Sequence, residues 1–551
     1  MGSFKRFGLI LMTSSACAAL SACGGADSVA SPGAGSVVIV QPTPTPAPSP
    51  TATPTANITA AQFAAVTAVN NVSITADEQL AIVNAGTNNN VNGTGAALNG
   101  IYPTSSTSLT TATDPSTLNS FFTSTNYVGA LNGPNDTAFQ GWTCNAPGLD
   151  FGGGGTSCSS NSALATYIGT TAEASAASCP TGTIDDGLVQ SRKACRLPQN
   201  ITSNLTLPKV AGVFYRLRGQ TEVGADLGSS GGAGVTLTIE PGVVILNDSS
   251  EATNDLLLVN RGSKIQAVGT RSLPIIFSGQ FNLGGNANFG DNTQGLWGGI
   301  ILLGRAPTAV CATGTGPNNA AGSSTTCQLA IEGVTGRFYG GANQTDSSGQ
   351  MSYVQIRYSG IAISEGNELQ GLTLGGTGSG TVLDHIQSHN SADDGIEIFG
   401  GTTNLKYIAI TGADDDGFDI DNGYRGFMQF MIAAQRPSGA TADSFSTEID
   451  SNNAEELLPR TFGRYANFTF IQTAAAPAAI RLRGGADMTF INGIVKSTQQ
   501  GVACVNLMAG AGSGEDRTTI RAAGRGPTDN NGPQEAGPPV FTSVYFSCNG
   551  R

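Results

Sequence analysis

The residues best suited to bind a cation or to catalyse a reaction are carboxylates that recur between positions 393 and 421. Residues 393–398 (Asp-Asp-Gly-Ile-Glu-Ile) and 415–420 (Asp-Asp-Gly-Phe-Asp-Ile) align with a constant offset of 22 residues. In both segments apolar residues alternate with acidic ones, as in a strand with one buried face. If the two strands are neighbours, their acidic side chains point away from the core and stack on one another.

This acidic column extends further along the chain. Residues 445–450 would add Glu448 and Asp450, and the segment 479–485 would place Arg481 and Arg483 in the same positions. Adjacent like charges destabilise a sheet, so a compensating group is expected. Calcium takes roughly 6–8 oxygen ligands, which clustered carboxylates can supply. We therefore predict a calcium site whose ligands are Asp394, Glu397, Asp414, Asp416, Asp419 and Asp421. The alternative is a solvated face on which aspartates cap turns.

The same carboxylates also allow an enzymatic interpretation. A stacked pair such as Glu397 and Asp419 would have about the 5 Å separation that retaining glycoside hydrolases use. A lyase would instead use calcium, with Arg357 or Arg425 as its base. Because acidic pairs arise in any ladder of this kind, a binding role is favoured over a catalytic one, and no catalytic residue is assigned.

The elements that position these residues are short strands. From residue 201 onward, β-rich runs end in Gly, Asn or Asp, with no clear helix of ten or more residues between them. That arrangement argues against alternating strands and helices. A period in the low twenties predicts a solenoid, and the regular Leu-Asn consensus of leucine-rich repeats is absent. We predict an all-β fold, a right-handed parallel β-helix over residues 201–551, with Ile396 stacked on Phe418 and Ile398 on Ile420.

The cysteines predict disulfides in an oxidising compartment. Of the ten, Cys17 lies in the predicted signal and Cys23 is the predicted lipidation site, so eight remain. An even count outside the cytoplasm indicates four disulfides. The eight are Cys144, Cys158, Cys179, Cys195, Cys311, Cys327, Cys504 and Cys548. Sequential pairing is one of many connectivities. Residues 57–200 are predicted to form a small, partly helical, irregular cap region clipped by the first of these bridges.

The N-terminus has the features of an export signal. Lys5 and Arg6 precede an uncharged run that ends in Leu20-Ser-Ala-Cys23. A basic start, an apolar run and small residues before a cleavage site are typical of secretory signals. Leu-Ser-Ala-Cys resembles the bacterial lipobox, which implies cleavage after residue 22 and acylation of Cys23. By the same resemblance, Gly24 favours the outer membrane, although the leaflet stays open.

A Pro- and Thr-rich segment follows the lipidated cysteine. Residues 23–56 include the alternating prolines of positions 41–50. Such segments adopt an extended, stiff conformation without a packed core. We predict a tether that holds the folded part away from the membrane.

The charge of the chain excludes one class of partner. Removing residues 1–22 would change the formal net charge from −13 to −15, because Lys5 and Arg6 leave with no acidic residue. A strongly acidic protein disfavours nucleic acid and anionic lipid as partners.

Several segments together resemble a known group of proteins. They are residues 237–245, 260–270, 274–277, 296–299, 331–333, 339–341, 371–376 and 415–421. Over roughly 200–551 the chain is similar to uncharacterised Gram-negative cell-surface and outer-membrane β-helix lipoproteins. At fold level only, it resembles pectin-lyase-like β-helices that bind or cleave polysaccharides. The resemblance implies fold and location, and fold analogy does not carry function.

From these observations we expect a surface-anchored outer-membrane lipoprotein that acts as a binding or structural module. Its role would be adhesion, glycan capture or docking beside an outer-membrane transporter. Its expected partners are the membrane, through the lipid on Cys23, and a polysaccharide or a transporter. The alternative is a calcium-dependent polysaccharide lyase or glycoside hydrolase built on a β-helix.

Overall fold

Strands dominate the part of the chain that the computed structural model describes. The described residues are 59–70, 83, 98–99, 102–103, 109–251, 254–312, 326–364, 366–436, 440–451, 459–508 and 536–549. The chain divides into two units, residues 1–53 and 54–551, and every described residue belongs to the second. The predicted signal, the predicted lipidation site Cys23 and the whole predicted tether lie outside the described residues. None of the helices found among the described residues is long and apolar enough to cross a membrane.

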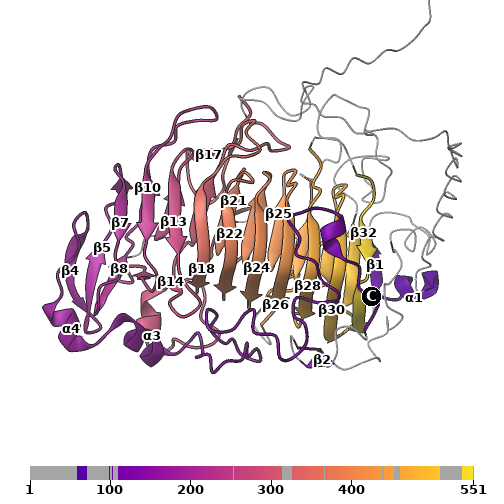
Figure 1. Ribbon diagram of the computed structural model, residues 1–551, viewed down its shortest axis with the longest axis horizontal. Helices are drawn as coiled ribbons and strands as arrows, with labels where there is room; N and C mark the ends of the chain where they lie inside the picture. Colours follow the sequence, from indigo (N-terminus) through magenta and orange to yellow (C-terminus); the bar gives the residue numbers. More distant parts are fainter. Residues whose placement is uncertain are drawn as a thin grey trace, which may run out of the picture. The chain divides into compact units, whose positions relative to one another are not determined.

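Two long sheets wind through the second unit (Figure 1). Sheet A comprises, in spatial order, β1 (Thr67–Asn70), β31 (Ala503–Met508), β29 (Ala478–Leu482), β27 (Thr447–Ile449), β25 (Phe418–Asp421), β23 (Ile396–Phe399), β21 (Leu372–Gly375), β15 (Ile300–Leu303), β12 (Leu256–Val259), β9 (Gln220–Val223) and β6 (Asn200–Ile201). All neighbouring strands of sheet A are parallel.

The strands of sheet B follow one another in the same order as those of sheet A, from the C-terminal to the N-terminal end of the β-helix. Its main path is β32 (Val540–Thr542), β30 (Thr489–Gln500), β28 (Arg464–Gln472), β26 (Phe427–Ala434), β24 (Asn404–Thr411), β22 (Val382–His389), β18 (Gly349–Arg357), β14 (Ile275–Ser278), β11 (Val244–Leu246), β8 (Val213–Arg216), β5 (Arg192–Arg196) and β4 (Ile184–Val189). Four further strands pair with it: β7 (Leu205–Leu207), β10 (Thr236–Ile239), β13 (Lys264–Val268) and β33 (Tyr545–Asn549). Because the chain alternates between the two sheets, each turn of the chain forms one coil of a parallel β-helix, as predicted.

The corner within each later coil is a residue in the left-handed backbone conformation. In β18 the first half pairs with β13 and the second half with β14, and Tyr353 between them has φ of 55°. The same conformation recurs one coil at a time at His385, Tyr407, Phe430, Asn467 and Asn492. Non-glycine residues rarely adopt positive φ, so a repeated corner of this kind marks a defined bend in every coil.

Aromatic rings stack at this corner. The ring centroids of Tyr353 and His385 are 4.3 Å apart, those of His385 and Tyr407 4.5 Å, and those of Tyr407 and Phe430 4.6 Å. The His385 ring also bonds through Nδ1 to the Asp384 carboxylate at 2.6 Å. His385 is thus part of the ladder that lines the bend.

The interior of the coils is apolar. Ile396 is the register partner of Phe418, and Ile398 is the partner of Ile420, so both predicted stacks are confirmed. All four side chains are completely buried. Each coil therefore covers the apolar face of its neighbour, which is how solenoids bury a continuous core.

The segment before the β-helix contacts the coils over most of their length. At one end β1 pairs with β31, and α1 (Ala60–Ala64) precedes it with a capping box between Thr59 and Gln62. Further along, Phe139 and Trp142 pack on the aromatic corner of sheet B. At the other end lie α3 (Asn161–Ile168), α4 (Thr171–Ala176) and the antiparallel pair of β4 with β5. The segment predicted as a cap thus covers the side of the coils in its middle part, and its two ends lie at the two ends of the β-helix.

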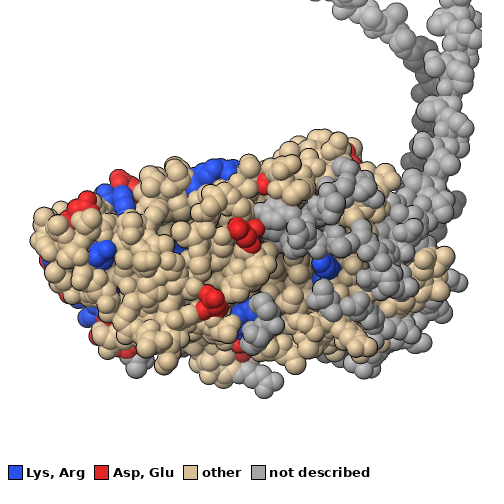
Figure 2. Space-filling view, turned by 90° about the horizontal axis from the view of Figure 1, so that it is seen from below, with Lys and Arg blue, Asp and Glu red and all other residues tan. Residues whose placement is uncertain are grey.

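The remaining elements are short. They are η1 (Pro115–Thr117), η2 (Gln280–Leu283), and the antiparallel pairs β2 (Leu98–Asn99) with β3 (Tyr102–Pro103), β16 (Leu329–Ala330) with β17 (Phe338–Tyr339), and β19 (Ile361–Ser364) with β20 (Asn367–Leu369). Figure 2 views the unit from below Figure 1 and shows a face on which charged side chains are sparse. The acidic residues of the sequence are therefore not gathered on this face.

Four disulfides clip the structure. They join Cys144 to Cys158, Cys179 to Cys195, Cys311 to Cys327 and Cys504 to Cys548. This is the sequential pairing considered from the sequence. The last bridge ties β31 to β33, so it links sheet A to sheet B at the end of the coil stack.

Truncating the core should destabilise the protein far more than truncating the surface. We expect Ile398→Ala to lower the free energy of unfolding by about 2–5 kcal/mol, because it leaves a cavity between stacked coils. Val382→Ala, on a strand residue that is 44% exposed, should change it by no more than about 0.5 kcal/mol. Denaturant titration of both variants measures the difference. Equal effects would contradict a coil interior packed around Ile398.

Candidate acidic site on sheet A

The predicted acidic column exists on the outer side of sheet A. Strand register places Glu397 of β23 beside Asp419 of β25, then Glu448 of β27, then Arg481 of β29. Side chains that alternate with the buried ones must point out of the coil. The column is therefore a direct result of the same register that stacks the apolar core residues.

Two arginines neutralise one end of the column. Arg481 Nη1 lies 2.8 Å from Glu448 Oε2, and Arg483 Nε lies 2.7 Å from Asp450 Oδ2. Arg483 also reaches Glu448 Oε1 at 3.4 Å. The acidic residues of β27 and of the turn after it thus have cationic partners.

The other end of the column is a cluster of carboxylates. Asp394, Glu397 and Asp419 each place one carboxylate oxygen within 4.8 Å of the others, and so do Asp393, Asp394 and Asp415. Asp394 and Glu397 are both only 6% exposed, and Glu397 Oε2 has no hydrogen-bond partner. We call these five residues the acidic cluster. Burying several charges so close together is costly unless something compensates them.

Tight turns before the strands position the cluster. Asp394 Oδ1 accepts a hydrogen bond of 2.9 Å from the backbone N–H of Asp416, one coil further along. Asp416 Oδ1 in turn accepts one of 2.6 Å from the backbone N–H of Phe445. These two aspartates therefore link consecutive coils, which is a structural use of the Asp-Asp-Gly repeat.

One carboxyl group beside the acidic cluster comes from outside the repeat. Glu332, in the excursion between β15 and β18, shares a side-chain hydrogen bond with Glu397 and accepts one of 2.7 Å from Gln370 Nε2. A hydrogen bond between two carboxyl groups requires a proton on one of them. No functional role was predicted for Glu332, because no periodic signal connects it to the column.

The carboxyl groups of the acidic cluster have raised pKa values. Burial, with Asp419 and other carboxylates nearby, raises the pKa of Asp394 well above its usual range. Burial and Glu332 do the same to the pKa of Glu397. Burial, followed by the charge of Asp415, raises the pKa of Asp393 to about 8. Without a cation, the cluster would therefore carry protons near neutral pH.

Three other predicted ligands differ in their surroundings. Asp414 forms an ion pair with Arg436 and accepts a hydrogen bond of 2.7 Å from Gln294 Nε2, so it is already neutralised. Asp421 accepts a bond of 2.7 Å from the N–H of Asn422, and burial beside Asp450 raises its pKa to about 7. Asp416 is buried, and its pKa is raised in the same way as that of Asp394.

The two arginines considered as lyase bases lie in other environments. Arg357 ends β18 of sheet B and bonds to Gln355. Arg425 lies against the ring of Phe462, 5.4 Å from its centroid, and lines a separate pocket beside Thr402. Trp297, in the segment 296–299 that resembles known β-helix proteins, is buried and donates from Nε1 to the Arg357 carbonyl at 2.9 Å. It is therefore a packing residue.

The raised pKa values of the acidic cluster should make the thermal stability of the protein fall as the pH rises. Each raised carboxyl keeps its proton in the folded state at pH values where the unfolded chain, with pKa values of about 4, has lost it. In EDTA, thermal stability should therefore fall as pH rises from about 4 to about 8, through the pKa values of about 6 for Asp415, 7 for Asp421 and 8 for Asp393.

Melting temperatures measured at intervals over this range test the expectation. Glu397→Gln, which is neutral at every pH, should give a shallower slope. A melting temperature that stays flat or rises over the same range would show that these carboxyls do not hold protons in the folded state.

Comparison with known proteins agrees with the fold. A family model described as a pectate-lyase-like beta helix domain matches residues 199–522, more than half of the chain. No curated protein and no solved structure matches the chain. The match spans the coils that carry the acidic column. The chain belongs to the family of pectate-lyase-like β-helix domains.

Proposed function

We propose that this protein is a lipid-anchored binding or docking module of the bacterial outer-membrane surface, and that its acidic cluster holds a calcium ion. The observation that carries the calcium assignment is that the buried Asp394 and Glu397 and the half-buried Asp419 place carboxylate oxygens within 4.8 Å of one another, with one Glu397 oxygen left without a partner. Carboxylate oxygens are the ligands that calcium prefers. The ion would supply the positive charge that Arg481 and Arg483 supply further along the column.

Calcium binding by the full-length chain tests this assignment. We expect calorimetric titration at pH 7.5 to show a dissociation constant of about 1 mM or tighter, as in extracellular calcium modules. Asp394→Asn combined with Asp419→Asn should abolish binding, because it removes two of the three carboxylates of the group that contains Glu397. Asp384→Asn, which removes one carboxylate from β22 on sheet B, is the matched control and should bind like the wild type.

The two outcomes separate the two ways of neutralising the cluster. Heat that is lost in the double variant supports the calcium site. An absence of heat, together with the fall in stability between pH 4 and 8, would mean that protons alone neutralise the cluster.

A binding role fits the cluster better than a catalytic one. Asp394 and Glu397 are almost completely covered, whereas an acid and a base must reach the bond that they cleave. The spacing of Glu397 and Asp419 and the family to which the chain belongs favour a polysaccharide-cleaving enzyme as the second candidate. Incubation of the calcium-loaded protein with acidic polysaccharides distinguishes them: retention without new reducing ends or unsaturated products supports binding, and such products support cleavage.

The anchoring half of the proposal rests on the N-terminal sequence. Lys5, Arg6 and the Leu20-Ser-Ala-Cys23 segment have the order of a lipoprotein signal, and the Pro-rich residues after it suit a tether. Several acyl chains hold a protein at a membrane far more firmly than one.

Replacing the acylated cysteine tests the anchor. In a Gram-negative host fed radioactive palmitate, we expect the full-length chain to be labelled and to fractionate with the outer membrane. Cys23→Ala should lose the label and leave the membrane fraction, while Cys17→Ala, within the apolar run, should keep both. Equal labelling of all three proteins would exclude Cys23 as the acylated residue.

A further inference from the structure

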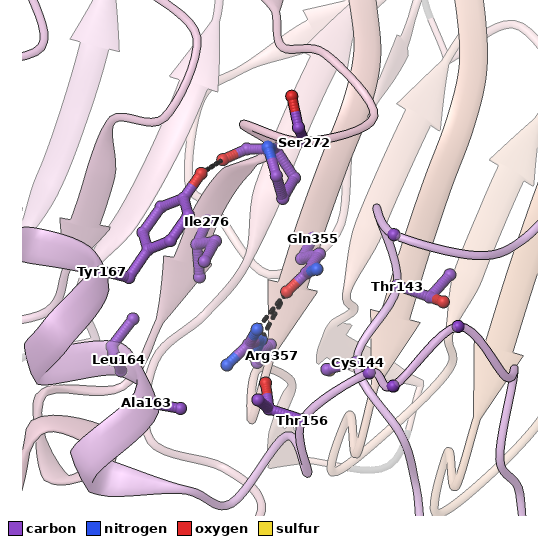
Figure 3. Close-up of a pocket in the computed structure, with 15 residues that line it drawn as sticks. Thr143, Cys144, Thr156, Ala163, Leu164, Tyr167, Ser272, Ile276, Gln355 and Arg357 are labelled. Atoms are coloured by element: carbon purple, nitrogen blue, oxygen red, sulfur yellow. Dashed lines mark hydrogen bonds between the residues drawn. The ribbon is translucent and has the colours of Figure 1, made fainter.

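A pocket of about 300 Å³ lies between the N-terminal segment and sheet B (Figure 3). On one side it is lined by α3 and by the glycine-rich turn at residues 153–156, which the disulfide between Cys144 and Cys158 closes into a loop. On the other side it is lined by residues of β14 and β18, including Arg357. It is thus formed by two parts of the chain far apart in sequence, and it lies on a different sheet from the acidic column.

Arg357 is a buried cation without a counter-charge in this pocket. It is 5% exposed, and its Nε donates to Gln355 Oε1 at 2.8 Å. Its Nη1 lies 3.3 Å from both the Cys158 carbonyl and Asn282 Oδ1. All three acceptors are neutral, and Arg357 makes no ion pair with a carboxylate of the described residues. Burial lowers its pKa to about 10, so the guanidinium stays charged at neutral pH.

The guanidinium also has donor capacity left. It carries five N–H groups in a planar fork. One points from Nε to Gln355, two from Nη1 to Cys158 and Asn282, and one from Nη2 to Gln355. The other Nη2 N–H has no acceptor among the described residues. A buried positive charge with an unused donor favours an anionic acceptor.

The remainder of the lining restricts what that anion is. Among the described residues that line the pocket, Arg357 is the only charged one, and none is acidic. A dianion would therefore leave a buried negative charge uncompensated, and a ligand with an ammonium group would find no partner. Leu164 and Ile276 give the pocket an apolar wall. The hydroxyl of Tyr167 donates to the Pro274 carbonyl at 2.6 Å, so its ring is held beside them.

We propose that this pocket binds a small organic monocarboxylate, with its carboxylate on Arg357 and an apolar or aromatic body against Leu164, Ile276 and the ring of Tyr167. The cavity is at the lower end of the range of roughly 300–1,000 Å³ that is typical of small-molecule sites. A single-ring acid fits this volume and this combination of one positive charge with an apolar wall. The site is independent of the proposed calcium site, because it shares no residue with the acidic cluster.

Benzoate binding to the full-length chain tests the proposal. By calorimetry we expect saturable binding of one benzoate, and binding at least tenfold weaker for benzamide, which has the same shape without the charge, and for inorganic phosphate. Arg357→Met should abolish binding. Ala163→Phe, which fills the pocket from α3 and leaves Arg357 in place, should also abolish it, and this variant decides the question if Arg357→Met does not fold.

A matched control removes a different positive charge at the same end of the β-helix. Arg192 on β5 donates to the Ala165 carbonyl and does not line the pocket, so Arg192→Met should bind benzoate like the wild type. The proposal is overturned if the wild type shows no saturable benzoate binding, or if Ala163→Phe binds as well as the wild type. Phosphate binding as tight as that of benzoate would also overturn it, since the pocket would then be a general anion site.

Discussion

Parallel hydrogen bonding between successive coils places every residue beside its counterpart one coil away, at about 4.8 Å. For Ile398 and Ile420 this proximity is favourable, because it removes apolar surface from water. For Glu397 and Asp419, one position earlier in the same strands, it forces two carboxylates together. The register that stabilises the apolar interior therefore also creates the repulsion between carboxylates on the outside. A shift in register would change both the interior stacking and the repulsion. Arginines, protons or a cation are the available solutions, and different coils use different ones.

The two sites described above are electrostatic opposites. The acidic cluster concentrates negative charge on sheet A, whereas the pocket on sheet B isolates one positive charge, that of Arg357, among neutral oxygens. In both, covering segments exclude water: the excursion that carries Glu332 lies over the acidic cluster, and the N-terminal segment lies over Arg357. Both sites thus combine a residue of the regular coil with a cover of irregular structure.

The sequence predicted the residues that repeat from coil to coil, but it did not predict the contributions of segments that do not repeat. The offset of 22 residues was enough to place Phe418 on Ile396. The similarity of segments 445–450 and 479–485 to the repeat then extended the acidic column to Arg481. Glu332 lies in an excursion without a counterpart in other coils, so no pattern could bring it to the site. The pocket was missed for the same reason. Residues between 141 and 167 line one side of it, and irregular segments carry no periodic signal for their path.

The pairing of β1 with β31 also has a consequence for how the chain reaches its native state. In a solenoid each coil contacts its neighbours, so assembly can proceed from coil to coil. Here Asn70 at the end of β1 bonds to Asn506, 436 residues later. Contacts so distant in sequence form slowly. A strand made early in synthesis must therefore wait, with its hydrogen-bonding groups unpaired in the sheet, until almost all of the chain has been made and the last coils have formed.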